Sequence, residues 1–460
     1  MARISGKYIG TRAFYASALS IMLPIAIQNG LTNFVNLLDN VMVGRIGTEA
    51  MSGVSISNQL IFVFNLCIFG LVSGAGIFSA QFFGKEDEEG IRESMRVKLV
   101  SGLAVSLLAI ALFLSKGRFL ISLFLRGDSN GGDMDATLAF GFSYLRIMLI
   151  GLPGFVMTQV YSSMLREGGE TILPMKAGMA AIAVNLFLNW VLIFGNLGFP
   201  ALGADGAAIA TVISRYVEAL SIIIVSRFSG RFRYMEGLYS SFRISSGLAG
   251  RILVSSLPLM LNETAWSFGM TFISQCYSTR GLNAVAGVNI STTINNLFNV
   301  TVLAMGNTIG IMIGHLLGAG KCDEAVDTDR KLIAFDLFIA AGTGIILSFI
   351  APLFPMIYNT TEGARRIATQ MILSQALILP LFAFKNGTYF TLRSGGRVII
   401  TILFDSAFLW IVGVPIAYFT SRYTSLPVYA IFLLVQAGDI IKCVIGYILV
   451  RKRIWVRRIV

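Results

Sequence analysis

The sequence predicts an all-α membrane protein with twelve transmembrane helices arranged as two parallel six-helix bundles related by a pseudo-twofold repeat. The first observation is that residues 23–84 align without a gap on 257–318 at an offset of 234, and a second block repeats at an offset of 227. Internal repeats of this kind are typical of membrane transporters. The second is composition: the chain is 55% hydrophobic and 13% charged, with a mean hydropathy of +0.76. A soluble domain carries about 25% charged residues, so most of this surface must face lipid.

Apolar runs of helical length provide the third observation. A membrane-spanning helix needs about 20 residues, and twelve runs approach or exceed that length, although 97–115 is marginal. The runs are 14–36, 52–83, 97–115, 137–164, 172–195, 205–226, 247–277, 285–317, 331–355, 367–391, 398–420 and 425–450. Six helices per half is an even number, so both halves enter the membrane from the same side and the repeats are parallel.

The repeat also matches prolines and glycines between the halves. Pro24 in the first run matches Pro258 in the seventh, and both are expected to bend their helices because proline removes a backbone hydrogen bond. A static kink required for packing is the alternative. Matched glycines such as Gly53 and Gly287 are expected to let helices approach closely.

The predicted domains are an N-terminal lobe (1–228), a polar and basic cytoplasmic linker (229–246) and a C-terminal lobe (247–460). Lys and Arg collect in the N-terminal tail, the 84–98 loop, this linker and the C-terminal tail. Because positive charge concentrates in cytoplasmic loops, both termini are predicted to be cytoplasmic in a multi-pass protein of the inner membrane.

Several function classes are excluded by the sequence. The formal net charge of +12 does not indicate nucleic-acid binding, because the basic residues lie in short loops between apolar runs. No HExxH, P-loop or nucleophile-elbow motif occurs, so neither an enzyme nor an ATP-driven pump is expected. The four Cys form no CxxC pair, and we expect no cofactor beyond a coupling ion.

Five short stretches carry a family resemblance. They are LDNVMVG (38–44), QFFG (81–84), LREGG (165–169), AVNLFLNWVLIFG (183–195) and GADGAAIAT (203–211). Their order, the helix count and the repeat resemble the multidrug and toxic compound extrusion (MATE) family of cation-coupled antiporters. The resemblance covers nearly the whole chain. It implies two six-helix bundles forming a V around a central cavity, and export of organic, often cationic compounds in exchange for Na⁺ or H⁺.

Asp39, late in the first helix, is the leading candidate for ion coupling. A carboxylate inside a membrane helix costs about 2.5–3.5 kcal/mol on insertion scales, which a cation or proton site would explain. The resemblance places Asp39 in such a site with Asn185, Asn189 and Thr211, whose oxygens suit a hard cation such as Na⁺. The position of Asn189 is often Asp in the family, so this site has one negative charge fewer. The alternative is that these side chains only hydrogen-bond helices together.

Glu263, in the seventh helix, is the second coupling candidate. In one subfamily of the resembling family, the matching Glu forms the coupling site together with an Asp on the tenth helix. That Asp is missing here, and Lys385 lies in the neighbourhood instead. A lone buried charge is costly, so we expect Lys385 to pair with Glu263 or Asp405, either as a switch or as a static ion pair. Arg215, one turn after Thr211, is expected to neutralise Asp39 or another acceptor of the N-terminal lobe, or to be purely structural.

The predicted function is therefore secondary active multidrug efflux by alternating access. The expected partners are small organic substrates and the lipid bilayer, and we expect a monomer. Two alternatives stay open: a flippase for lipid-linked or amphipathic substrates of the same superfamily, and a membrane sensor or scaffold that transports nothing.

Overall fold

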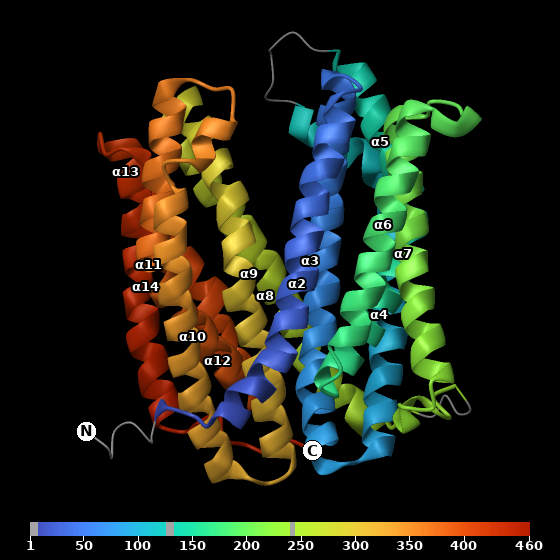
Figure 1. Cartoon of the computed structure of the whole chain (residues 1–460), viewed down its shortest axis with the longest axis vertical. Coiled ribbons are helices and arrows are strands. Elements are labelled where there is room, and N and C mark those ends of the chain that lie inside the picture. The colour runs from blue at the N-terminus through green and yellow to red at the C-terminus, as the bar shows by residue number, and fades with distance from the viewer. Residues whose placement is uncertain (1–7, 126–132, 240–243) are drawn as a thin grey trace. The chain divides into compact units, whose positions relative to one another are not determined.

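The computed structural model describes residues 8–125, 133–239 and 244–460, so residues 1–7 of the predicted tail and 240–243 of the predicted linker lie outside it. Helices occupy all twelve predicted segments (Figure 1). They are α2 (Arg12–Gly44), α3 (Thr48–Lys85), α4 (Glu88–Leu125), α5 (Met134–Glu167), α6 (Ile172–Phe194), α7 (Gly203–Phe228), α8 (Ser246–Ser278), α9 (Leu282–Gly318), α10 (Cys322–Ile350), α11 (Glu362–Ser394), α12 (Val398–Ile402) with α13 (Val414–Tyr423), and α14 (Val428–Arg451).

Most helices extend beyond the apolar run that predicts them. The marginal run 97–115 belongs to α4, which has 38 residues. Its first turns are polar but helical, with Arg92 paired to Glu88 four residues earlier, an arrangement that supports a helix outside the apolar region. The side chain of Asp133 similarly caps α5 by accepting from the backbone N–H groups of Asp135 and Ala136. Hydropathy detects only the lipid-facing part of such helices.

The eleventh helix is irregular, whereas the sequence predicts one regular segment. Between α12 and α13 the chain forms two π-helical turns, Leu403–Ala407 and Leu409–Gly413. The first turn carries Asp405. Such π-turns are rare and often occur at functional sites.

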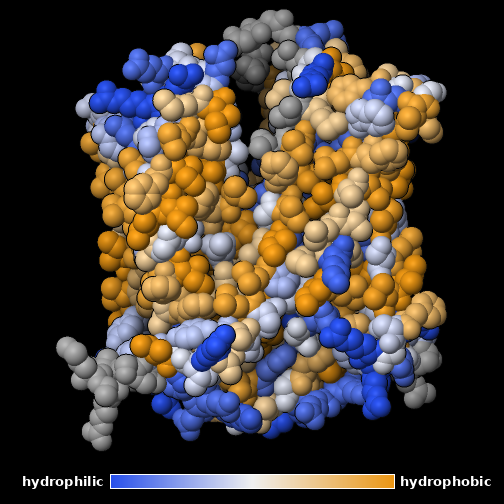
Figure 2. Space-filling model, viewed as in Figure 1, coloured by the Kyte–Doolittle hydropathy of each residue, from blue (hydrophilic) through white to orange (hydrophobic). Residues whose placement is uncertain are grey.

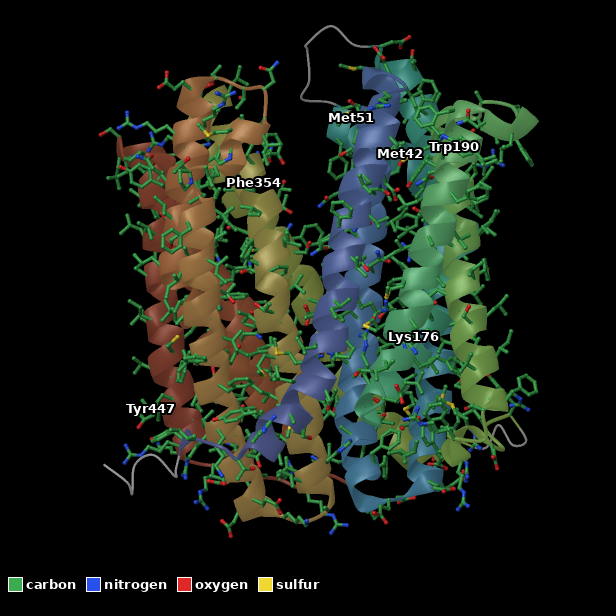
Figure 3. All side chains as sticks on the ribbon, viewed as in Figure 1. Met42, Met51, Lys176, Trp190, Phe354 and Tyr447 are labelled. Atoms are coloured by element: carbon green, nitrogen blue, oxygen red, sulfur yellow. The ribbon has the colours of Figure 1, made fainter. Side chains whose placement is uncertain are left out.

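Eleven of the twelve described helical segments are long and apolar enough to cross a membrane, with Val398–Tyr423 counted as one segment. The exception is α8, because polar residues such as Asn262, Glu263 and Thr264 occupy its middle. The visible helix faces are apolar along their length and polar at the ends (Figure 2). Trp190 near the end of α6 and Tyr447 near the end of α14 are 46% and 54% exposed (Figure 3), as expected for aromatic side chains at a membrane interface.

The chain packs into two compact units. Residues 27–79 and 88–260 form the N-terminal unit, and residues 1–26, 80–87 and 261–460 form the C-terminal unit. The chain passes between units two residues after Pro24 in α2 and two residues after Pro258 in α8. The sequence repeat therefore recurs in the packing, with each matched proline just before a unit boundary. The predicted lobe boundaries follow the repeat and stay a prediction.

Three of the matched glycines, Gly53, Gly84 and Gly318, lie where backbones touch, whereas a Cβ on Gly287 would first meet the Ile367 side chain, at 2.6 Å. In the N-terminal unit, a Cβ on Gly53 would lie 2.5 Å from the carbonyl oxygen of Thr137. In the C-terminal unit, the ends of α3 and α9 cross so closely that a Cβ on Gly84 would meet the carbonyl oxygen of His315, and one on Gly318 would meet that of Gln81. Gly84 and Gly318 are repeat mates, so each supplies the same contact to the other helix.

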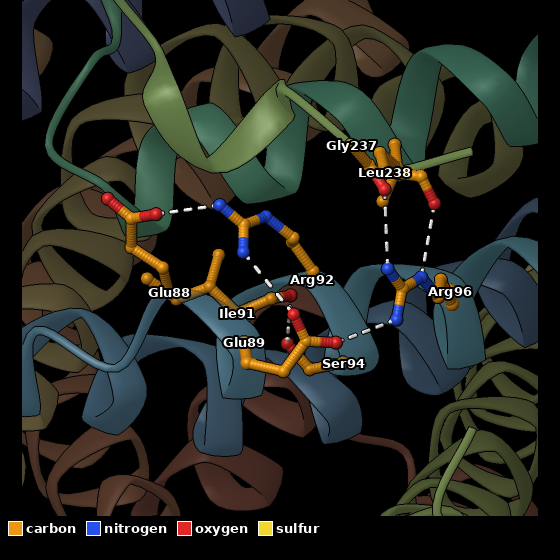
Figure 4. A network of polar contacts seen from close by, with 8 residues as sticks. All are labelled: Glu88, Glu89, Ile91, Arg92, Ser94, Arg96, Gly237 and Leu238. Carbon is orange, nitrogen blue, oxygen red and sulfur yellow. Dashed lines mark hydrogen bonds and ion pairs between the residues drawn. The ribbon is translucent and has the colours of Figure 1, made fainter. Parts of the chain in front are cut away.

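The described part of the predicted linker packs onto α4 of the N-terminal unit. Arg96, only 3% exposed, donates through Nε to the carbonyl of Leu238 at 3.1 Å and through Nη2 to that of Gly237 at 3.4 Å (Figure 4). Its Nη1 also pairs with Glu89 at 2.9 Å. A planar guanidinium can satisfy all these acceptors at once, so this linker segment is fixed to the unit and not a free tether.

Candidate ion-coupling sites

The four residues of the predicted N-terminal site lie together in the N-terminal unit. Asn189 donates through Nδ2 to Asp39 Oδ1 at 2.6 Å and to Asn185 Oδ1 at 3.1 Å, and Asn185 donates to Thr211 Oγ1 at 3.4 Å. The cluster therefore joins α2, α6 and α7. Asn185 and Asn189 meet because residues four apart share one face of α6, and α7 packs against that helix.

The cluster is buried and not fully satisfied. Asn185 and Asn189 are 5% and 1% exposed. Asn189 uses its amide nitrogen for both hydrogen bonds, and its Oδ1 has no hydrogen-bond partner in the described residues. A buried acceptor without a partner costs about 1–3 kcal/mol. A small cation beside Asp39 would satisfy it.

This donor set is chemically consistent with a single monovalent ion. It offers one carboxylate, amide oxygens and a hydroxyl, all oxygen ligands of the kind hard cations prefer. Among the described residues no group of three or more His, Cys, Asp and Glu side chains could hold a metal. The arrangement suits Na⁺ or a proton on Asp39 better than a divalent metal.

Arg215 does not reach Asp39 in an ion pair within the described residues. Its guanidinium lies over the ring of Phe155, 4.8 Å from the centroid, and its electrostatic partner is Glu218 on the next turn of α7. Neutralisation of Asp39, one of the predicted roles, is therefore wrong, while the more general role with another acceptor fits Glu218. A lone Glu in the apolar sixth run was the signal that sequence reasoning missed.

Glu263 in the C-terminal unit has partners on α11. Arg393 Nη1 lies 3.8 Å from Glu263 Oε1, and Tyr389 donates its hydroxyl to the same oxygen at 3.4 Å. Arg393 is 4% exposed and also donates to Tyr389 at 3.2 Å. The three side chains form a small closed network in which the carboxylate is neutralised by a buried cation.

The predicted pairing of Lys385 with Glu263 or Asp405 is wrong. Lys385 Nζ instead lies 2.5 Å from Asp439 Oδ2 on α14, and Lys442 lies 3.7 Å from Asp439 Oδ1. The physical reason is packing, because α14 lies against α11 and brings a nearer carboxylate. Asp439 and Lys442, three residues apart inside an apolar run, were visible in the sequence as a second intramembrane pair.

Asp405 is held by Asn262, a residue that sequence reasoning did not single out. Asn262 Nδ2 donates to Asp405 Oδ2 at 2.9 Å, while Ser406 donates its hydroxyl to Asn262 Oδ1 at 2.6 Å. Lys442 donates to the backbone carbonyl of Asp405 at 3.3 Å. The π-turn thus directs both Asp405 and Ser406 toward Asn262 of α8. Hydrogen bonds hold Asp405 there, and Lys385 pairs with Asp439 instead.

The sequence analysis did not single out a buried ion pair in the N-terminal unit or two buried carboxyl groups in the C-terminal unit. In the N-terminal unit, Lys98 is 0% exposed and pairs with Glu167 at 2.5 Å, with Ser163 bridging the two. In the C-terminal unit, α10 carries the buried carboxyl groups of Asp329 and Asp336. Asp336 lies inside a predicted apolar run, where any carboxylate is a candidate functional group.

Comparison with known proteins agrees with this architecture. The family model described as MatE matches residues 24–191 and 258–419, more than half of the chain, and both matches begin at a repeated proline. A Thermotoga maritima protein named "Probable multidrug resistance protein NorM" is 26% identical over 421 residues, covering 89% of this chain and 86% of that protein. Multidrug resistance protein MdtK of Pectobacterium atrosepticum is 25% identical over 370 residues, covering 80% and 78%.

Solved structures share the fold. An outward-facing multidrug resistance MATE family transporter of the MOP superfamily superposes with a TM-score of 0.83 at 22% identity, over 95% of each chain. A MOP superfamily transporter from Pyrococcus furiosus, described by a binding pocket of reverse polarity, gives 0.83 at 22% identity over 98% of this chain and 97% of that one. Because the family model spans both halves of the repeat, this chain belongs to the MATE family of membrane transporters.

Proposed function

We propose that this protein exports organic, often cationic compounds from the cell in exchange for Na⁺ or H⁺, by alternating access. The names of its relatives, which include multidrug resistance proteins, support the substrate class. The observation that carries the coupling proposal is the Asp39 cluster, where one carboxylate meets buried amides and an unpartnered Asn189 oxygen. Both termini are cytoplasmic and the protein acts as a monomer in this proposal.

Asp39 holds the ion, and Asn185, Asn189 and Thr211 complete its oxygen shell. Binding of Na⁺ or H⁺ neutralises the carboxylate, which removes the penalty for a buried charge and favours the closed packing of α2, α6 and α7. Loss of the ion restores the charge and favours water entry. Because a ligand shifts a conformational equilibrium only through differential affinity, the ion must bind the two access states unequally.

Glu263 and the Lys385–Asp439 pair are the proposed coupling elements of the C-terminal unit. Glu263 shares Arg393 with Tyr389, so protonation of this carboxylate would release the guanidinium. Lys385 and Asp439 would separate when a proton or substrate reaches Asp439, and Asp405 would respond through Lys442. The helix positions just after Pro24 and Pro258 are the proposed bending points, since each lies before a unit boundary.

The test is ethidium efflux from proteoliposomes of the full-length protein under an imposed Na⁺ gradient or an imposed H⁺ gradient, each applied alone. Efflux driven by one gradient supports antiport and identifies the ion. Efflux that ignores both gradients contradicts it. Failure of folded protein to move ethidium while it scrambles a fluorescent lipid-linked sugar analogue would favour the flippase alternative.

A further inference from the structure

Asp336 is a membrane-embedded carboxyl group without a described partner. It is 0% exposed, and neither Oδ1 nor Oδ2 has a hydrogen-bond partner in the part of the chain that the structure describes. It lies 14 residues beyond Cys322, the start of α10, which at 1.5 Å per residue is about 21 Å along the helix. This depth excludes an interfacial side chain that reaches water.

The surroundings of Asp336 are apolar. Leu332 and Ile333, one turn before it, belong to a core cluster of buried hydrophobic residues, and Ala340, one turn after it, belongs to another. Gly387 of α11 lies opposite, where an added Cβ would be 3.8 Å from Asp336 Oδ2. An ionised carboxylate at this place would lack both water and countercharge, and such groups take up a proton instead.

The charged and titratable groups on the neighbouring helices are engaged elsewhere. Lys385 and Arg393 of α11 pair with Asp439 and Glu263, and Lys331 of α10 pairs with Asp327. Other titratable groups on these helices include Tyr389 of α11, which donates to Glu263, His315 of α9 beside the Phe83 ring, and Tyr15 of α2, which accepts from the Gly10 amide. Arg330 of α10 interacts electrostatically with Asp329. Glu362, Arg365 and Arg366 lie in the first turn of α11, 21 or more residues before Gly387, which is about 30 Å along the helix. Within the described residues no cation therefore forms an ion pair with Asp336.

A second carboxyl group lies on the same face of α10 toward the helix start. Asp329, seven residues before Asp336 and 1% exposed, accepts from Thr391 Oγ1 at 2.5 Å, and its Oδ2 is unpartnered. Two turns separate the carboxyl groups, or about 10 Å. Beyond Asp329 lies the polar end of α10, where the Asp327 side chain is 48% exposed. Asp329 thus lies between the polar end of α10 and Asp336 in the apolar interior.

We propose that Asp336 is a proton-binding site of the C-terminal unit, filled and emptied by way of Asp329 and Thr391 through water that enters when α10 and α11 separate. The proton comes from water and returns to water, with no other group changed. Na⁺ fits less well, because the apolar neighbours of Asp336 supply no further oxygen ligands. Proton exchange at Asp336 accompanies each transport cycle, and this part of the proposal rests on the antiport proposed above.

Infrared difference spectroscopy of the purified full-length protein in detergent tests the proton site without transport. We expect the C=O stretch of protonated carboxyl groups at neutral pH in wild type, and the loss of the Asp336 component of this band in Asp336→Asn. Asp327→Asn is the matched control, an exposed carboxylate on the same helix, and should leave that band unchanged. Asp336→Leu, which suits the apolar neighbours, replaces the Asn variant if that variant does not fold. An unchanged band in both Asp336 variants would overturn the proposal.

Ethidium efflux driven by an H⁺ gradient tests the coupling part. We expect at least a tenfold loss in Asp336→Asn or Asp336→Leu and wild-type efflux in Asp327→Asn. Wild-type efflux in a folded Asp336 variant would overturn the coupling part. If wild type shows the carboxyl band but moves no ethidium, the antiport proposal fails while the proton site stands, so the two failures are distinguishable.

Discussion

Asn189 determines the charge of the N-terminal site, because an Asp in its place would add a second carboxylate beside Asp39. The hydrogen bond that now joins Asn189 Nδ2 to Asp39 Oδ1 is 2.6 Å long, so two carboxylates would lie close together. Like charges this near cannot both ionise without a cation between them. We expect Asn189→Asp to bind Na⁺ more tightly than wild type, since ligand charge raises cation affinity.

The measurement for Asn189→Asp is the rise in apparent melting temperature on adding Na⁺ at constant ionic strength, with K⁺ as the reference salt. Asn196→Asp serves as the control. Asn196 lies just after the end of α6, where it donates to the Trp190 carbonyl. An equal response to Na⁺ in wild type and Asn189→Asp would contradict a cation site at this cluster.

Asp439 is shared by two lysines, and this arrangement predicts an order of severity. Asp439→Asn removes the carboxylate that Lys385 and Lys442, which are 19% and 5% exposed, share. Lys385→Met leaves Asp439 with Lys442 and should cost less. Breaking a buried pair costs about 3–5 kcal/mol, so Asp439→Asn should lower the apparent melting temperature clearly. Thermal unfolding in detergent measures both variants, and the opposite order would show that the pair is not arranged as described.

The ends of α3 and α9 cross closely in the C-terminal unit. Gly84→Ala and Gly318→Ala each place a methyl group against a backbone carbonyl at the crossing of α3 and α9. Backbone cannot move aside as a side chain can, so both variants should be destabilised. Gly342→Ala in α10 is the control: a Cβ there meets nothing within 4 Å, and Ala is favoured over Gly in a helix by about 1 kcal/mol. Melting temperatures that leave all three variants equal would contradict the close crossing.

Attachment of the linker segment to α4 is also testable. Arg96→Lys keeps the charge but loses the planar fork that reaches Leu238, Gly237 and Glu89 together. We expect faster proteolytic cleavage near 229–239 in Arg96→Lys. Arg92→Lys on the same helix is the control, because the partners of Arg92 within the described residues are the exposed carboxylates of Glu88 and Glu89, and surface pairs contribute about 0–1 kcal/mol. Equal cleavage in the two variants would show that Arg96 does not fix this segment.

The sequence predicts the elements better than their partners. Twelve apolar runs locate the helices, because lipid-facing segments must be apolar, while polar extensions such as the start of α4 depend on ion pairs that hydropathy does not detect. The π-turns around Asp405 have no proline or glycine signal before Gly413. They become visible only in the backbone.

The candidate sites likewise contain residues that the sequence predicts and partners that it does not. Asp39, Asn185, Asn189 and Thr211 meet as the family resemblance implies, because the repeat and helix order fix which faces pack together. The partner of Lys385 was not predictable from spacing, since α11 and α14 are neighbours only in the folded unit. Asp329 and Asp336 could have been found by asking which carboxylates fall in or beside an apolar run.

For the whole molecule, the central proposal is that one ion held by Asp39 drives substrate efflux. The direct measurement is ethidium efflux from proteoliposomes of wild type and Asp39→Asn under each single-ion gradient, with ethidium binding to the detergent-purified proteins measured by fluorescence anisotropy. Asp205→Asn is the control, a carboxylate in the first turn of α7 that accepts from Ser143 at 2.9 Å. We expect Asp39→Asn to bind ethidium but lose gradient-driven efflux. Wild-type gradient-driven efflux in Asp39→Asn would contradict the proposal and transfer the coupling role to the C-terminal unit.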